Sequence, residues 1–113
     1  MKHVTHQMSL KQPYFNYISQ GTKTIELRLY DDKRSIINPG DRIVFSNNDG
    51  KLMVMVKGMV RAESFESLFD IIDVKQTGLE ERSKAVAIME QFYDKKAQEK
   101  YGVVGIIVEK MEE

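Results

Sequence analysis

The residues best suited to chemistry lie in one short segment, which runs from Gly21 to Arg28 and also contains Lys23 and Glu26. A lysine, a glutamate and an arginine so close together can hold a phosphate or support acid–base chemistry. Glu26 and Arg28 would share one face of a strand, with Cα atoms about 7 Å apart. Lys23 joins that face only if the chain is still turning there, which the preceding glycine favours. The simpler alternative is an exposed Glu26–Arg28 ion pair worth under about 1 kcal/mol, with Lys23 in solvent.

The elements that must position this segment follow from the hydrophobic pattern. Alternating residues predict a strand over 4–10. A helix over 11–20 begins near a proline and ends where Gly21 can take the left-handed conformation. A second strand is predicted over 23–30, with its apolar residues on one face and the charges of the motif on a solvent-exposed face.

The rest of the chain completes an α+β domain. Ser64 can cap a helix over 65–72, and Thr77 with Glu80 forms a capping-box pattern for another. The charged stretch 94–100 is interpreted as a solvated helix end or loop. Five or six mostly antiparallel strands and about three helices are expected, enough to close a small barrel. The remaining strands are predicted over 42–46, 52–60 and 103–108, and one shared core is expected from Ile25, Leu27, Val44 or Ile43, Val54 and Ile106.

Length and charge are those of an ordinary globular protein. The chain has 113 residues, 42% of them hydrophobic and 30% charged, which predicts one domain over residues 1–113. Seventeen basic residues balance seventeen acidic residues. A polyanionic ligand must therefore be held by a local cluster of charges and not by a global positive field.

Several classes of site and location are excluded or disfavoured by composition. The chain has no cysteine, which excludes disulfides and thiolate ligands and favours a reducing compartment. No apolar run has the length of a signal peptide or a membrane span, so we expect a cytoplasmic protein with no membrane partner. His3 and His6 would point to opposite faces of a strand, so we expect no metal.

The order and spacing of several motifs resemble the ASCH domain family. The pattern G-x-K-x-x-E-x-R is present at residues 21–28, after Tyr14, Phe15 and Ile18 of the predicted helix. The similarity continues through residues 32–34, 39–41, Phe65, 92–93 and 100–104. The family belongs to the PUA-like superfamily of small β-barrels, so the resemblance implies a PUA-like barrel that needs no cofactor.

The resemblance also implies a binding site. In this family the lysine and glutamate of the motif face a cleft between the barrel and the first helix, and clefts of related PUA-like domains bind RNA or modified bases. The two basic residues after the second strand would add phosphate contacts or form an ordinary basic loop, and a tyrosine of the first helix would stack on a base or pack in the core. The implied ligand-binding residues are Lys23, Glu26, Arg28, Lys33, Arg34 and Tyr14.

Some similar small ASCH-type enzymes hydrolyse the amide of N4-acetylcytidine with the motif lysine, a threonine nucleophile and a later glutamate. Lys23 matches the lysine, but Glu26 stands at the threonine position, and Thr24 lies too far along the strand to replace it. Lys23 and Glu26 would then be catalytic only with water as nucleophile. Glu80 or Glu81 would be the later glutamate. The leading expectation is a monomer that binds RNA or a modified nucleoside, and the alternatives are such an amidohydrolase or a protein-interaction module.

Overall fold

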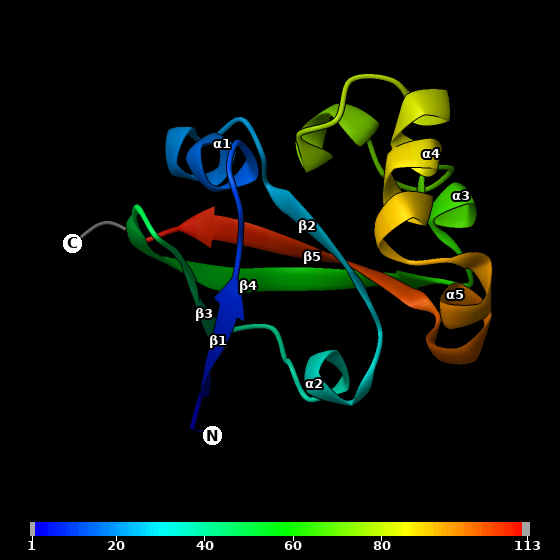
Figure 1. Cartoon of the computed structure of the whole chain (residues 1–113). Coiled ribbons are helices and arrows are strands. Elements are labelled where there is room, and N and C mark those ends of the chain that lie inside the picture. The colour runs from blue at the N-terminus through cyan, green and yellow to red at the C-terminus, as the bar shows by residue number, and fades with distance from the viewer. Residues whose placement is uncertain (1, 112–113) are drawn as a thin grey trace.

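The computed structural model describes residues 2–111 as a curled five-stranded sheet with helices packed around it (Figure 1). Strand β1 pairs in parallel with β3, and the other pairs are antiparallel. Strands β1 and β2 are the two edges, so the sheet is an open half-barrel, which confirms the predicted α+β fold. The strands are β1 (Thr5–Ser9), β2 (Ile25–Leu29), β3 (Arg42–Asn47), β4 (Gly50–Ala62) and β5 (Val103–Lys110), in the spatial order β1-β3-β4-β5-β2.

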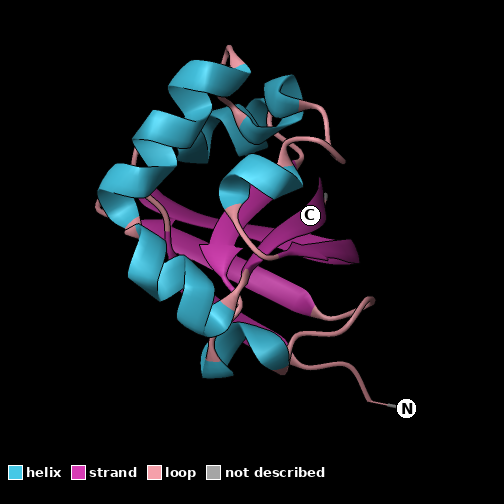
Figure 2. Cartoon of the chain, turned by 90° about the vertical axis from the view of Figure 1, so that its right-hand side faces the viewer, coloured by secondary structure: helices cyan, strands magenta, loops and turns pink. Residues whose placement is uncertain are grey.

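Helices flank the sheet at several points, and Figure 2 shows how they are stacked beside the strands. No helix among residues 2–111 is long and apolar enough to cross a membrane. The helices are α1 (Tyr14–Gln20), α2 (Asp32–Ser35), α3 (Phe65–Leu68), α4 (Arg82–Phe92) and α5 (Lys95–Tyr101), with a 3-10 helix η1 (Val74–Thr77) before α4.

Two predictions about these helices are wrong. Thr77 does not cap a helix, because it ends η1 and its hydroxyl donates to the carbonyl of Val74, while α4 begins only at Arg82. The stretch 94–100 is not a loop or a helix end, since the Asp94 side chain accepts a hydrogen bond from the Ala97 amide at 2.8 Å and starts the separate helix α5. The predicted cap at Ser64 is confirmed.

The apolar residues form two clusters instead of the one core that the pattern predicted. Ile43, Val54 and Ile106 pack together inside the curl of the sheet, under α1. Ile25 and Leu27 face the other way and pack with residues of α3 and α4. The division follows from strand alternation, because a curled sheet with helices on both sides buries both faces of its strands. The face of β2 opposite Ile25 and Leu27 therefore points into the curl.

A conservative change at Ile106 should show how tightly the inner cluster is packed. Ile106 is 0% exposed, so Ile106→Val should lower the free energy of unfolding by about 0.5–1.5 kcal/mol through the loss of one methylene. Urea denaturation measures the change. The same substitution at Ile71, which is 63% exposed, serves as the control and should have almost no effect. Equal effects at both sites would contradict the assignment of Ile106 to the core.

Asp41 fastens β1 to the turn before β3. Its carboxylate accepts hydrogen bonds from the amides of Val4 at 3.1 Å and Asn38 at 3.0 Å, and it lies 2.8 Å from Nε2 of His6. Burial raises the pKa of this carboxyl, but those bonds outweigh burial and hold the pKa below its usual range. His3 approaches the same carboxylate at 3.8 Å, so the prediction that His3 and His6 face opposite ways is wrong, because His3 precedes the strand.

Candidate functional site

The end of helix α1 decides where Lys23 points. Gly21 ends the helix with φ 85°, the left-handed conformation that the sequence predicted. The amides of Thr22 and Lys23 then both donate to the carbonyl of Tyr17 at 3.0 Å, so the chain is still turning at Lys23. Regular strand begins only at Ile25. The condition for Lys23 to join the face of Glu26 is therefore met.

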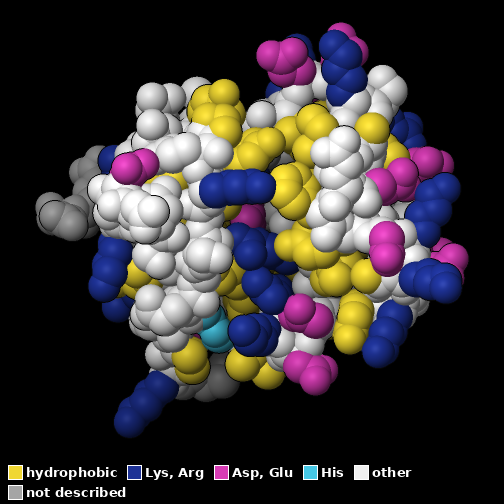
Figure 3. All heavy atoms as spheres, viewed as in Figure 1, with side chains coloured by type: hydrophobic (Ala, Val, Ile, Leu, Met, Phe, Trp, Pro, Cys, Tyr) yellow, Lys and Arg dark blue, Asp and Glu magenta, His cyan; other side chains and the backbone are white. Residues whose placement is uncertain are grey.

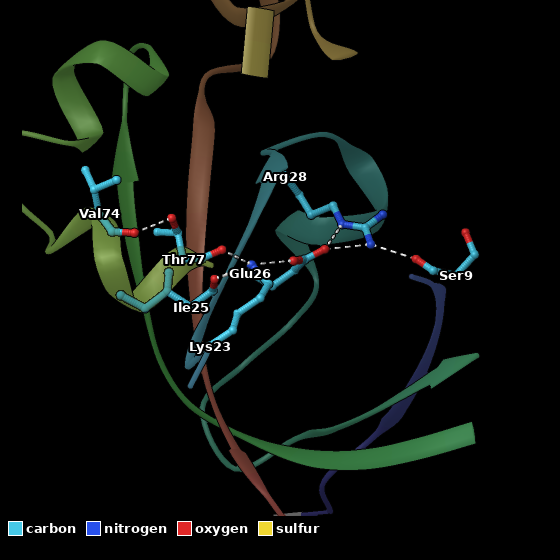
Figure 4. Close-up of polar contacts among 7 residues, drawn as sticks. All are labelled: Ser9, Lys23, Ile25, Glu26, Arg28, Val74 and Thr77. Carbon is cyan, nitrogen blue, oxygen red and sulfur yellow. Dashed lines mark hydrogen bonds and ion pairs between the residues drawn. The ribbon is translucent and has the colours of Figure 1, made fainter. Parts of the chain in front are cut away.

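Lys23, Glu26 and Arg28 form one ion cluster, in which the carboxylate lies between the two cations (Figure 4). Lys23 Nζ is 3.1 Å from Oε1 of Glu26. Arg28 donates from Nε to Oε2 at 2.8 Å, and its Nη2 lies 2.7 Å from the same oxygen as an ion pair. Glu26 is only 5% exposed, so the predicted solvent-exposed face of this strand is wrong. The reason is the curl of the sheet, which turns this face of β2 inward.

The ammonium of Lys23 is surrounded by acceptors. Besides Glu26, Nζ donates to the carbonyl of Ile25 at 2.7 Å and to that of Thr77 at 2.6 Å, and the side chain is 3% exposed. Burial lowers the pKa of Lys23 below its ordinary 10.5, and the neighbouring Glu26 carboxylate opposes that shift. Three acceptors match the three N–H bonds of an ammonium, so its donors are used within the protein.

Arg28 also joins the two edges of the half-barrel. Its Nη2 donates to the carbonyl of Ser9 on β1 at 2.7 Å. Strands β1 and β2 are not neighbours in the sheet, so this side chain spans the gap that a closed barrel would fill with a strand pair. The guanidinium thus links the buried carboxylate to the opposite edge.

The ion cluster lies in a cleft of about 390 Å³, which is within the usual size range of small-molecule sites. Figure 3 shows basic side chains gathered in the hollow middle of this face, with apolar side chains beside them. Tyr14 of α1 also lines the cleft. Its lining residues are Ser9, Leu10, Lys11, Tyr14, Lys23, Glu26, Leu27, Arg28, Ser46, Asn47, Asn48, Thr77, Leu79, Met89, Phe92 and Tyr93.

Part of this lining was missed from the sequence. Lys11 lies between β1 and α1, with Nζ 4.1 Å from the ring centroid of Phe92, an aromatic residue that is 47% exposed. Tyr93 follows it at the end of α4. An aromatic residue at the end of a predicted helix was the available signal, but its place beside Lys11 depends on packing across 81 positions of sequence. The residues described as lining the cleft include three basic side chains, Lys11, Lys23 and Arg28, and one acidic side chain, Glu26.

Other predicted site residues lie outside this cleft. Lys33 and Arg34 belong to the short helix α2, and they line a second hollow with part of β1. Glu80 and Glu81 are exposed before α4 and do not line the cleft. Thr24 does not line it either. Within residues 2–111 the recorded partners of Lys23 Nζ are two carbonyls and a carboxylate, none of them a hydroxyl.

The sheet is a curled α+β half-barrel with a cleft between its first helix and its open edge, and this fold is shared with an ASCH-domain structure. The model of the ASCH domain matches residues 8–112, and the chain belongs to that family. No match was found among curated proteins.

Solved structures agree with this assignment. The chain is similar to the crystal structure of hypothetical protein PH0355, with 38% identity, a TM-score of 0.87 and coverage of 95% of this chain and 99% of that chain. The solution structure of protein PF0455 from Pyrococcus furiosus is 34% identical, with a TM-score of 0.78 and coverage of 96% and 99%. A ZmASCH variant from Zymomonas mobilis, 13% identical, shares the fold with a TM-score of 0.69 over 93% of this chain and 68% of its own.

Proposed function

We propose that the cleft binds a base of an RNA strand or of a nucleotide-like ligand, with Lys23, Glu26 and Arg28 as its recognition cluster. The family is one generally thought to bind RNA. The observation that carries the proposal is the buried Glu26 carboxylate, which is held at both oxygens by cations inside a cleft lined with aromatic and apolar side chains. Such a mixture of one fixed polar group and apolar walls is typical of sites that orient a flat, polar-edged ligand.

Counting hydrogen bonds indicates what Glu26 would recognise. A carboxylate has about four acceptor positions. Arg28 donates to Oε2 and lies against it with a second nitrogen, and Lys23 contacts Oε1, which leaves a lone pair of Oε1 for a donor from the ligand. An exocyclic amino group of a base is such a donor, and glutamate accepts from the amino group of cytosine in known recognition modes. Uracil offers only an N–H flanked by two carbonyl oxygens, which the carboxylate repels. We therefore expect amino-bearing bases to bind more tightly than uracil.

The cleft walls suit the rest of such a ligand. Tyr14, Phe92 and Tyr93 line the cleft and would supply aromatic partners for a base, an interaction worth about 1–3 kcal/mol per base. Lys11 and the part of Arg28 that does not contact Glu26 lie where phosphate oxygens would approach. Because the chain has no net charge, these local cations would supply the attraction for the backbone.

Hydrolysis of an amide is supported less well. A base-catalytic lysine needs a lone pair aimed at a hydroxyl, whereas the three recorded partners of Lys23 are all acceptors. Thr77, whose carbonyl binds Lys23, turns its hydroxyl to the carbonyl of Val74. The geometry is that of a lysine that holds a carboxylate in place. Binding is therefore favoured over amide cleavage.

The proposal predicts a characteristic salt dependence. If about three phosphates are contacted, log affinity for single-stranded RNA should fall with log salt at a slope near −2, at about 0.7 per phosphate. Fluorescence anisotropy with labelled single strands and duplexes measures this. Single strands should bind more tightly than duplexes, because the cleft admits an unstacked base and not a helix. Equal affinity for every duplex with a much steeper slope would indicate non-specific adhesion and contradict the proposal.

Two nucleoside probes test the cleft itself. Calorimetric titration should show tighter binding of cytidine than of uridine, by roughly tenfold for one hydrogen bond to a charged group. Incubation with N4-acetylcytidine, followed by its ultraviolet spectrum, should show no change. Rapid deacetylation would overturn the binding proposal in favour of an amidohydrolase.

A further inference from the structure

A second hollow adjoins the cleft on the side of helix α2. Its volume is about 280 Å³. Ser9 lines both hollows, so the two meet at this residue of β1. Its lining residues are His6, Gln7, Met8 and Ser9 of β1 with Lys33, Arg34 and Ile36 of α2 and its end.

Arg28 stands where the two hollows meet. Its guanidinium contacts the Glu26 carboxylate on one side and the carbonyl of Ser9 on the other. Arg28 thus contacts the residue that the two linings share, while the cations of the second hollow are Lys33 and Arg34. On this face Figure 3 shows Lys and Arg side chains along the furrow in the middle, with acidic side chains beside them near its lower end.

The acids near the second hollow are already engaged or lie outside its lining. Asp31 pairs with Nη1 of Arg34 at 3.1 Å, and it also caps α2. Asp41 is held by His6 and two backbone amides. Asp32 is exposed in the first turn of α2 and is not part of the lining. The lining of this hollow therefore presents two cations and no carboxylate to an incoming group.

One atom of Arg34 has an unmet hydrogen bond. Its Nε is buried and has no hydrogen-bond partner among the residues that the structure describes. Buried donors in folded proteins are almost always paired, so the hydrogen bonding of the Arg34 guanidinium is incomplete within the described part of the protein, and a ligand would reach Nε only if the side chain shifted. Phosphate oxygens are the acceptors that a guanidinium binds best, because they match its fork of donors.

From these observations we infer that the second hollow is a phosphate subsite for the same strand whose base enters the cleft. This inference rests on the proposed function and narrows it: the ligand is a nucleotide within a single strand, or one that carries a phosphate, and not a free nucleoside. The base contacts the Glu26 cluster, the linking sugar passes Ser9 and Arg28, and the adjoining phosphate lies between Lys33 and Arg34.

Calorimetry with a graded set of cytidine compounds tests the inference. The probes are cytidine, cytidine 5′-monophosphate, cytidine 3′-monophosphate and tricytidylic acid, each at the same salt concentration. One of the two monophosphates and the trinucleotide should bind roughly tenfold more tightly than cytidine, as expected for one or two charge-assisted hydrogen bonds. If cytidine binds and neither a phosphate nor a longer strand adds affinity, the second hollow is not a phosphate subsite, although the proposed function stands.

Variants of the second hollow test where the affinity gained from the phosphate arises. Lys33→Gln with Arg34→Gln should remove the tenfold gain and leave cytidine binding unchanged, and Lys33→Gln alone, at an exposed position, should remove part of it. Lys57→Gln, which removes an equal charge from an exposed site on β4 outside both hollows, should keep the whole gain. A gain that survives in the double variant would place the phosphate elsewhere. Failure of the unaltered protein to bind any of the four probes would overturn the proposed function and this inference together.

Discussion

Glu26→Ala is expected to lower the free energy of unfolding by about 3–5 kcal/mol and to weaken ligand binding roughly 10- to 100-fold. The carboxylate is 5% exposed and accepts from both Lys23 and Arg28. Without it, two cations face one another in a poorly solvated site with no counter-charge, and removal of one member of a buried ion group is costly for that reason. Urea denaturation and calorimetric titration measure the two effects.

A milder variant separates binding from folding. Glu26→Gln keeps an acceptor for Lys23 but loses the negative charge and offers an amide N–H₂ near Arg28. It should fold, lose about 1–3 kcal/mol of stability and lose the preference for cytidine over uridine. Glu99→Ala, at an exposed glutamate on α5, is the matched control and should change neither quantity. If Glu26→Ala costs less than about 1 kcal/mol and leaves affinity unchanged, the cluster is the surface ion pair that the sequence alone also allowed.

Local sequence signals predicted the parts of the site that lie close together in the chain. Gly21 marked the end of α1, and the alternation of Ile25 and Leu27 fixed which face of β2 carries the charges. Those two signals account for the contact between Lys23 and Glu26, three residues apart.

The remaining features depend on packing between distant segments. The carbonyl of Thr77 reaches Lys23 across 54 positions, and nothing in the capping-box pattern at Thr77 distinguishes a helix start from the end of η1. The burial of Glu26 could not be predicted without the curl of the sheet, because period-two alternation separates the two faces of a strand but does not say which face is exposed to solvent. The placement of Lys33 and Arg34 beside β1 depends likewise on where α2 docks. The sequence pattern therefore predicted that Lys23, Glu26 and Arg28 come together, but not what surrounds them.

Lys23→Met is expected to weaken binding roughly 10- to 100-fold and to change how stability depends on pH. Methionine fills the space of the lysine stem but removes the ammonium that holds Oε1 of Glu26, so the carboxylate is left with Arg28 alone and can turn away from the ligand. Titration with cytidine measures the loss. Lys75→Met, at an exposed lysine of η1, is the control and should bind as the unaltered protein does.

The pH dependence has a definite sign. Burial lowers the pKa of Lys23 in the folded protein below its ordinary 10.5, so between these two pKa values the unfolded chain binds more protons than the folded one. The free energy of unfolding should therefore rise with pH in the window that ends near 10.5, by at most about 1.4 kcal/mol per pH unit from this group. Lys23→Met lacks the group and should lack this rise, while Lys75→Met should retain it. Urea denaturation of the three proteins from pH 7 to pH 10 gives the comparison. Parallel curves for Lys23→Met and the unaltered protein would mean that burial does not perturb this ammonium, and the account of Lys23 as a desolvated cation that holds Glu26 would be wrong.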